Sequence, residues 1–306
     1  MTAPPPAPLT AGGRAGSWRP PENVGYVVCD VDGTLVGPDA LASPPVIEAV
    51  AAAVAAGIRV GYATGRMRDA VGPLHTQVNA NGPHVLHNGA EVRVEGGTIA
   101  AWPLWPEAVD ALLDLARSRD DTYVEIYTES GYLASAMDER ARPHWGILGA
   151  RPRGVISRAA ELDGAAVLKA TFAAFDPDTV PEVVAAIEEL GLRAGAAGSP
   201  ITPGLVYVNA THPDADKGLA VTFAAQHLGI SLSEVVAIGD AANDLSMLAV
   251  AGTAIAMGQA DPEVRAAAHL VVPAVEADGV AAALDTIRGW NDRQPPAAPT
   301  GGDDGS

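Results

Sequence analysis

Asp30 and Asp32 lie in the five-residue segment Asp-Val-Asp-Gly-Thr and are separated by one residue. The segment directly follows an apolar run at 26–29 that is typical of a buried strand. In an open α/β sheet, ligands bind beyond the carboxyl ends of the strands. One carboxylate could there attack an electrophile while the other transfers a proton. The alternative is a turn held by Asx-type hydrogen bonds, which is common where Asp and Gly cluster.

Two further segments offer groups that suit a phosphate. Thr64 and Gly65 follow a second predicted strand, where a small hydroxyl and free backbone N–H groups can bind a phosphate oxygen. Such a turn also commonly serves only to cap a helix. Lys217 stands at the start of a predicted helix and is one of only two lysines, the other being Lys169. Its ammonium could hold a phosphate, and the alternative is a solvated surface lysine.

Asp240, Asn243 and Asp244 form a third group, again directly after a predicted strand. These two carboxylates would add negative charge beside Asp30 and Asp32. Like charges gathered so closely are unfavourable unless a cation neutralises them. Because Mg²⁺ prefers a few carboxylates together with water and phosphate oxygens, the sequence indicates a hard divalent ion at this place.

Short β-rich runs alternate with helices around these residues. Helices are predicted at 43–57 and 217–228, and strands at 25–29, 58–62, 83–87, 235–238, 254–257 and 270–272. Strands that alternate with helices imply βαβ units and a parallel sheet. The carboxyl ends of such strands would bring the candidate residues to one edge of the sheet.

The middle of the chain has a different pattern, with hairpin signals near 91–101 and 122–136 and helices near 106–117 and 180–190. We therefore predict a core domain formed by 24–90 and 206–290 and interrupted by an α+β cap domain at 91–205. The first 23 residues are rich in Pro, Ala and Gly, and residues 291–306 have a similar composition. Both segments are predicted to be disordered.

Composition excludes several classes of protein. The 306 residues include 37 acidic and 19 basic side chains, for a formal charge of −18, which argues against binding to nucleic acid or to an anionic membrane surface. Cys29 is the single cysteine, so a disulfide framework and a four-cysteine zinc site are excluded. The longest uncharged apolar stretch, 49–58, is too short to cross a bilayer. With no secretory signal pattern at the start, a cytoplasmic location is expected.

Together the motifs resemble the haloacid dehalogenase-like hydrolase superfamily. Its hallmark is an Asp-x-Asp-Gly-Thr start, then a Thr or Ser, then a Lys, then a Gly-Asp-x-x-x-Asp end. The spacing is similar to the Cof-type branch, subfamily IIB, and Asn88-Gly89-Ala90 is a further match. The resemblance covers about residues 24 to 288 and implies a Rossmann-like α/β parallel-sheet core with an inserted α+β cap.

The resemblance also implies a role for each matched residue. Asp30 would be the nucleophile that accepts the phosphoryl group, and Asp32 the acid that protonates the leaving alkoxide and then activates water. Asp240, the Asp30 carboxylate and the Asp32 backbone carbonyl would ligate Mg²⁺, with Asp244 acting mainly through a water ligand. The phosphate-binding residues would be Thr64, Gly65, Lys217 and Asn243.

The function implied is a Mg²⁺-dependent phosphatase that acts on small phosphorylated metabolites, with sugar phosphates as the expected class. A phosphomutase of the phosphomannomutase type is one alternative, because it shares the Asp-Val-Asp-Gly-Thr segment. A non-catalytic protein that binds phosphorylated metabolites is another. The only partner expected is a small phosphate ester, and the sequence indicates no oligomeric state.

Overall fold

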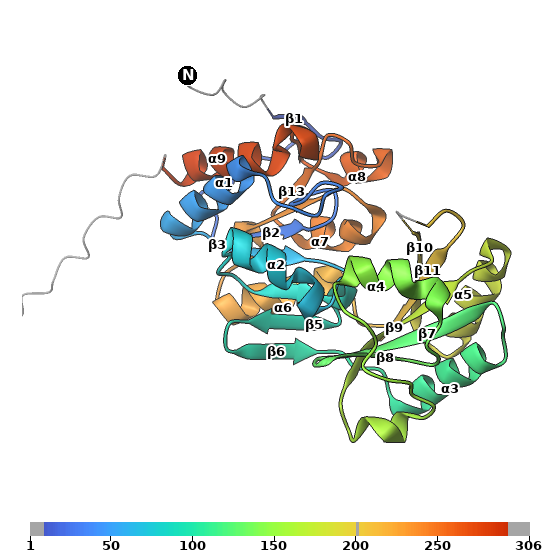
Figure 1. Ribbon diagram of the computed structural model, residues 1–306. Coiled ribbons are helices and arrows are strands. Elements are labelled where there is room, and N and C mark those ends of the chain that lie inside the picture. The colour runs from blue at the N-terminus through green and yellow to red at the C-terminus, as the bar shows by residue number, and fades with distance from the viewer. Residues whose placement is uncertain (1–8, 200–201, 293–306) are drawn as a thin grey trace, which may run out of the picture.

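The computed structural model describes residues 9–199 and 202–292, which form two β-sheets with flanking helices (Figure 1). The strand order of the larger sheet is β1-β14-β13-β12-β2-β3-β4-β5-β6. The six strands from β14 to β4 run parallel. At one edge β1 pairs antiparallel with β14, and at the other β5 pairs antiparallel with β4 and then with β6. The strands are β1 (Thr10–Ala11), β2 (Tyr26–Asp30), β3 (Arg59–Ala63), β4 (His84–Leu86), β5 (Glu91–Val94), β6 (Gly97–Ala101), β12 (Val235–Gly239), β13 (Thr253–Ala256) and β14 (Leu270–Val271). The predicted α/β class with a parallel sheet is confirmed.

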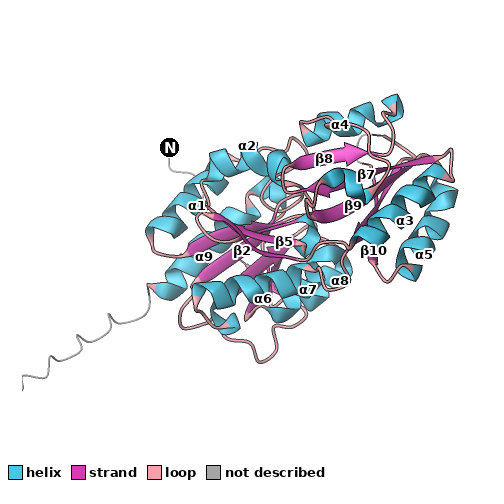
Figure 2. Cartoon of the chain, turned by 90° about the horizontal axis from the view of Figure 1, so that it is seen from below, coloured by secondary structure: helices cyan, strands magenta, loops and turns pink. Residues whose placement is uncertain are grey.

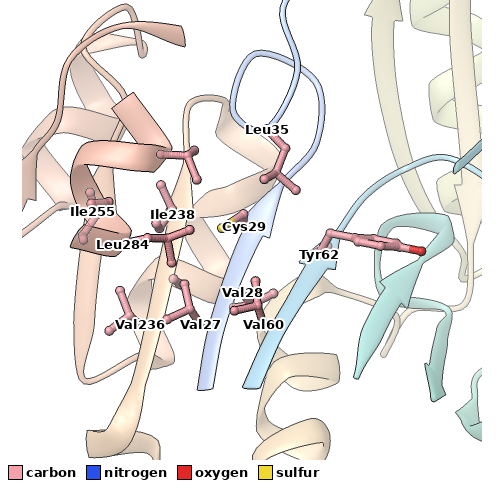
Figure 3. Packing of buried hydrophobic residues seen from close by; sticks show 14 of the residues in the cluster. Val27, Val28, Cys29, Leu35, Val60, Tyr62, Val236, Ile238, Ile255 and Leu284 are labelled. Atoms are coloured by element: carbon pink, nitrogen blue, oxygen red, sulfur yellow. The ribbon is translucent and has the colours of Figure 1, made fainter. Parts of the chain in front are cut away.

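Helices cover both faces of this sheet, with α1 and α2 on one side and α6 and α7 on the other (Figure 2). They are α1 (Pro44–Ala55), α2 (Arg68–Val78), α6 (Lys217–Leu228), α7 (Leu245–Val250), α8 (Pro262–Ala267) and α9 (Gly279–Asn291). Because both faces are covered, β2 and β12 are buried along their whole length and rich in Val and Ile. Val27 and Val236 pair in register, and Figure 3 shows them in the core with Leu284.

Local signals fix the ends of the helices that flank the candidate residues. Ser43 caps α1 by accepting a hydrogen bond from the backbone N–H of Val46 at 3.4 Å. Asp216 caps α6 by accepting one from Leu219 at 2.8 Å, and Gly229 ends that helix in a left-handed conformation. The helix starts predicted near 43 and at 217 are therefore confirmed. No helix in the described part of the chain has the length and apolarity to cross a membrane.

The smaller sheet is antiparallel throughout, in the order β10-β11-β9-β7-β8. On one face its side chains pack with α3 and α5, and on the other with α4. The elements are β7 (Thr122–Thr128), β8 (Gly131–Ala134), β9 (Val167–Ala174), β10 (Arg193–Gly198), β11 (Val206–Thr211), α3 (Pro106–Arg117), α4 (Arg142–Leu148) and α5 (Val180–Glu189). This is the inserted α+β unit, which we call the cap.

The predicted cap boundaries, 91 and 205, are wrong at both ends. The hairpin β5–β6 extends the core sheet, because Val92 of β5 pairs with Val85 of β4. Conversely, β11 at 206–211 pairs with β9 and β10 inside the cap sheet. A hairpin has the same kind of sequence whether it joins the core sheet or the cap sheet, so only its pairing with distant strands shows to which sheet it belongs. The cap therefore lies between β6 and α6.

The prediction of a disordered arm is wrong for residues 9–23. Thr10 and Ala11 form β1, which pairs with β14. Trp18 stacks on His269, with 5.7 Å between ring centroids, and also contacts the ring of Trp290. A single large aromatic side chain thus anchors a segment whose average composition is that of a flexible chain. Residues 1–8 lie outside the described residues, as does the predicted tail from residue 293 onward, while Asn291 ends α9.

Replacing Trp18 with alanine should lower the free energy of unfolding by about 2 kcal/mol, because the half-buried indole loses its contacts with both rings. Urea denaturation measures this value. Leu41→Ala is the matched control, because Leu41 is 53% exposed and its loss should change stability by less than about 0.5 kcal/mol. Equal midpoints for Trp18→Ala and the unmodified chain would show that the Trp18 side chain contributes nothing to stability.

Candidate active site

The candidate residues meet at the carboxyl edge of the parallel sheet. Asp30 is the last residue of β2, and Thr64 follows the last residue of the neighbouring β3. Asp240 follows β12 on the other side of β2, and Lys217 is the first residue of α6. Parallel pairing places these strand ends side by side, which is the arrangement the sequence predicts.

Lys217 is the cation at the centre of this group. Its Nζ donates to Oδ1 of Asp30 at 2.5 Å and to Oδ1 of Asp244 at 2.6 Å. Only 1% of Lys217 is exposed, so the alternative of a solvated surface lysine is wrong. Burial by itself would lower the pKa of Lys217, but the carboxylates of Asp30 and Asp244 raise it above its usual value. The lysine is therefore charged at neutral pH.

Three carboxylates surround this one ammonium. Ligand oxygens of Asp30, Asp240 and Asp244 all lie within 4.8 Å of one another. Burial raises the pKa of Asp30 to about 8, Lys217 opposes that shift, and the charges on Asp244 and Asp240 add to it. Within the described residues, Lys217 is the only cation in contact with the cluster, so all three carboxylates can be ionised together at neutral pH only if a further cation is bound. Such a set of oxygen ligands fits a hard divalent ion such as Mg²⁺.

Neighbouring groups orient Asp240. The Thr34 hydroxyl donates to its Oδ1 at 3.1 Å, and Gln259 Nε2 donates to its Oδ2 at 3.5 Å and to the carbonyl of Gly33 at 2.6 Å. Gly33 has a φ of +83°, and a Cβ there would lie 2.3 Å from Oδ2 of Asp240. The segment after β2 therefore requires glycine at this position to let Asp240 approach.

Asp244 differs from the other two carboxylates because it is fully buried and both of its oxygens already accept hydrogen bonds. Its Oδ1 accepts from Lys217, and its Oδ2 accepts from the backbone N–H groups of Asp240 at 3.0 Å and Ala241 at 3.1 Å. This side chain therefore fixes the loop after β12 and the position of Lys217. A direct bond from Asp244 to a metal would compete with these contacts.

The Asp32 carboxylate lies outside the cluster formed by Asp30, Asp240 and Asp244. Its side chain is 60% exposed and paired with Arg66, whose Nε donates to Oδ2 at 3.0 Å and whose Nη2 donates to Oδ1. This pairing leaves only the backbone carbonyl of Asp32 for the predicted metal role. Arg66 therefore holds the Asp32 carboxylate in a salt bridge that is separate from the cluster.

Thr64, Gly65 and Asn243 are brought together through Asn88, for which the only signal in the sequence is its place in the family pattern. The backbone N–H of Asn88 donates to the Thr64 carbonyl at 2.9 Å, and Asn243 Nδ2 lies 3.4 Å from Asn88 Oδ1. A Cβ at Gly65 would meet Asn88 Oδ1 at 2.9 Å. Asn88 and the preceding His87 both have positive φ angles, a strained conformation that is commonest at functional sites.

Sequence reasoning missed Arg66 and Lys169 as residues of the site. Lys169 comes from β9 of the cap, and its Nζ donates to the Gly65 carbonyl at 2.9 Å. The available signal was that Lys169 is one of only two lysines in the chain, and both are buried here. Arg66 adjoins Thr64 and Gly65 in the sequence, but nothing local indicates that it pairs with Asp32.

Comparison with known proteins gives one family. Residues 27–284 match the family model described as haloacid dehalogenase-like hydrolase. The chain is 28% identical to a 5-amino-6-(5-phospho-D-ribitylamino)uracil phosphatase of Bacillus subtilis, over 85% of this chain and 97% of that protein. It is 37% identical over 83 residues to a phosphoglycolate phosphatase of Methanothermobacter thermautotrophicus, a match that spans only 38% of that relative's length.

Among solved structures, a sugar phosphatase of subclass IIB in the same superfamily matches with a TM-score of 0.71 at 25% identity. That match covers 87% of this chain and 99% of the other. Both the core and the cap therefore have counterparts in a known structure. The predicted fold and the predicted Cof-type resemblance are confirmed.

Proposed function

Because the chain belongs to the haloacid dehalogenase-like hydrolases, we propose that it is a Mg²⁺-dependent phosphatase that forms an aspartyl phosphate on Asp30. It is a Cof-type hydrolase of phosphoric monoesters, as its relatives are. The observation that carries the finer proposal is the Asp30 carboxylate itself. It lies at the end of β2, held by Lys217 and facing two further carboxylates.

The residues divide the reaction between them. Asp30 attacks the phosphorus atom, and the bond from phosphorus to the leaving oxygen breaks. Asp32, the more exposed carboxylate, donates a proton to that oxygen and then takes one from the water that releases phosphate. Lys217, the Thr64 hydroxyl, the Gly65 N–H and Asn243 bind the oxygens of the transferred phosphoryl group.

Mg²⁺ would be held by Asp30, Asp240 and the Asp32 carbonyl. Asp244 would support this site by fixing Lys217 and the loop after β12. When bound, it neutralises charge on the phosphoryl oxygens. The chain's own part is to keep Asp30 fixed: Lys217 contacts Oδ1 of Asp30 and leaves Oδ2 without a hydrogen bond from any other described residue. That second oxygen is the one we assign to the attack.

The substrates we propose are small phosphorylated metabolites, with sugar phosphates as the main class. The support is the solved subclass IIB sugar phosphatase and the relatives named for phosphoglycolate and for a phosphoribityl compound. Lys169 of the cap contacts the Gly65 carbonyl at this edge of the core sheet, so we expect the cap to limit the size of the leaving alcohol.

A phosphate-release screen over sugar phosphates, phosphoglycolate and pyridoxal phosphate, with Mg²⁺ present, tests this function. A phosphatase releases one free phosphate for each ester consumed, whereas a phosphomutase returns the phosphoryl group to the sugar. Turnover near zero across the whole panel would favour the binding protein instead, and stoichiometric release would exclude both alternatives.

Gly33→Ala should lower kcat/KM at least about tenfold and raise the Mg²⁺ concentration needed for half-maximal activity. The new methyl group would meet Oδ2 of Asp240 at 2.3 Å, so Asp240 must move away from Asp30. Titrating activity with Mg²⁺ measures both effects. Gly37→Ala is the matched control, because its Cβ would have no neighbour closer than 3.9 Å. If both variants keep the normal Mg²⁺ dependence, the proposed place of Asp240 is wrong.

A further inference from the structure

Lys169 reaches the candidate active site from the cap. It lies on β9, the middle strand of the cap sheet, and pairs across the sheet with Tyr127 of β7. Its Nζ sits 4.5 Å from the centroid of the Tyr127 ring and donates to the carbonyl of Gly65, in the turn proposed to bind phosphate. The aliphatic stem is enclosed, and only 7% of the residue is exposed.

Among the described residues, this buried ammonium has no counter-ion. No carboxylate in the described ranges, 9–199 and 202–292, comes within ion-pair distance of Lys169. Glu125 is the acidic residue whose field acts on it, but its own oxygens accept hydrogen bonds from Tyr123 and Tyr127 and contact His144. Burial lowers the pKa of Lys169 to about 8, and Glu125 opposes that shift only in part.

A buried charge without a partner is unfavourable unless something else supplies the opposite charge. Lys217, the other lysine of the chain, differs in this respect because the carboxylates of Asp30 and Asp244 both contact its ammonium. The carbonyl of Gly65 offers Lys169 a dipole but no charge. An anion that arrives with the substrate would complete this site.

We propose that Lys169 binds an anionic group on the leaving alcohol, either a carboxylate or a second phosphate, and so selects substrates that carry two anionic groups. The inference rests on the proposed phosphatase function and deepens it. The transferred phosphoryl group lies against Asp30 and Lys217 in the core, whereas Lys169 belongs to the cap, which covers the opposite end of the ester. Lys169 therefore determines which alcohol is accepted.

Matched pairs of substrates test this role. The carboxylate pair is 3-phosphoglycerate and glycerol 3-phosphate, and the phosphate pair is fructose 1,6-bisphosphate and fructose 6-phosphate. For at least one pair we expect kcat/KM to be about tenfold or more higher for the ester with the additional anion. The pair that shows the preference identifies the anion.

Lys169→Met keeps the length of the stem over Tyr127 and removes the charge, so it should fold. It should lose most of its kcat/KM for the ester with the additional anion and far less for the counterpart without that anion, so the preference falls about tenfold or more. Lys169→Arg should recover most of the preference. Arg151→Met, which removes an exposed positive charge from the same cap, is the matched control and should keep the preference.

An equal loss of kcat/KM for both members of each pair would overturn the proposal, because Lys169 would then serve the transferred phosphoryl group or the fold. An unmodified protein that prefers the esters without the additional anion would overturn it as well. Calorimetric binding of the same four esters to the non-reacting Asp30→Asn variant separates this result from failure of the phosphatase function. If nothing is hydrolysed but Lys169→Met in that background still loses the binding preference, only the phosphatase function has failed. If no binding preference exists, the inference on Lys169 is wrong.

Discussion

Asp30→Asn should remove nearly all activity while leaving the fold intact. An amide has almost the same shape as the carboxylate but cannot attack phosphorus, so we expect kcat to fall at least about 1000-fold, which corresponds to about 4 kcal/mol of barrier. The asparagine oxygen can still accept from Lys217, as Oδ1 of Asp30 does at 2.5 Å. Thermal unfolding should therefore stay cooperative, and phosphate release measures the loss.

Asp32→Asn is the informative control, because the two carboxylates have different roles in the proposal. Without Asp32, an aryl phosphate with a good leaving group should still transfer its phosphoryl group to Asp30, since that leaving group needs no proton. Sugar phosphates should react far more slowly. If both variants kept more than about a tenth of the normal rate, a loss of under about 1.4 kcal/mol, neither role could stand.

The parallel sheet could be predicted because its signals are local. The run 26–29 is apolar throughout, Ser43 and Gly57 mark the ends of a helix, and β12 repeats the pattern of β2. The cap boundaries could not be predicted in this way. Whether the hairpin at 91–101 joins β4 or the cap sheet depends on pairing between strands, and its sequence is compatible with both.

In the candidate site, too, some residues could be predicted from local sequence and others depend on contacts between distant segments. Asp30, Thr64 and Asp240 stand at strand ends, and the parallel order of those strands brings them together. Lys169 is 104 residues from Gly65 in the sequence, and their contact depends on how the cap docks on the core. Trp18 anchors the arm in the same non-local way, through contacts with His269 and Trp290. Such contacts depend on single side chains, so the average composition of a segment cannot predict them.

Removing divalent cations should abolish activity, and adding Mg²⁺ should restore it. Oxygens of Asp30, Asp240 and Asp244 lie within 4.8 Å of one another, and among the described residues Lys217 is the only cation that contacts them. A phosphate ester brings about two more negative charges, so without a cation it is repelled from Asp30. We expect the rate in excess chelator to fall below about one hundredth of the rate with Mg²⁺.

Replacing Mg²⁺ with Ca²⁺ is the more discriminating test, because Ca²⁺ should bind but fail to support turnover. It accepts six to eight oxygens in loose geometry, whereas Mg²⁺ demands octahedral geometry and leaves one oxygen of Asp30 free to attack. Ca²⁺ should therefore inhibit in competition with Mg²⁺. Thermal unfolding in chelator controls for loss of the fold, since Lys217 still pairs with Asp30 and Asp244 there. Full activity in chelator, or equal rates with Ca²⁺ and Mg²⁺, would contradict the roles of Asp30 and Asp240 together.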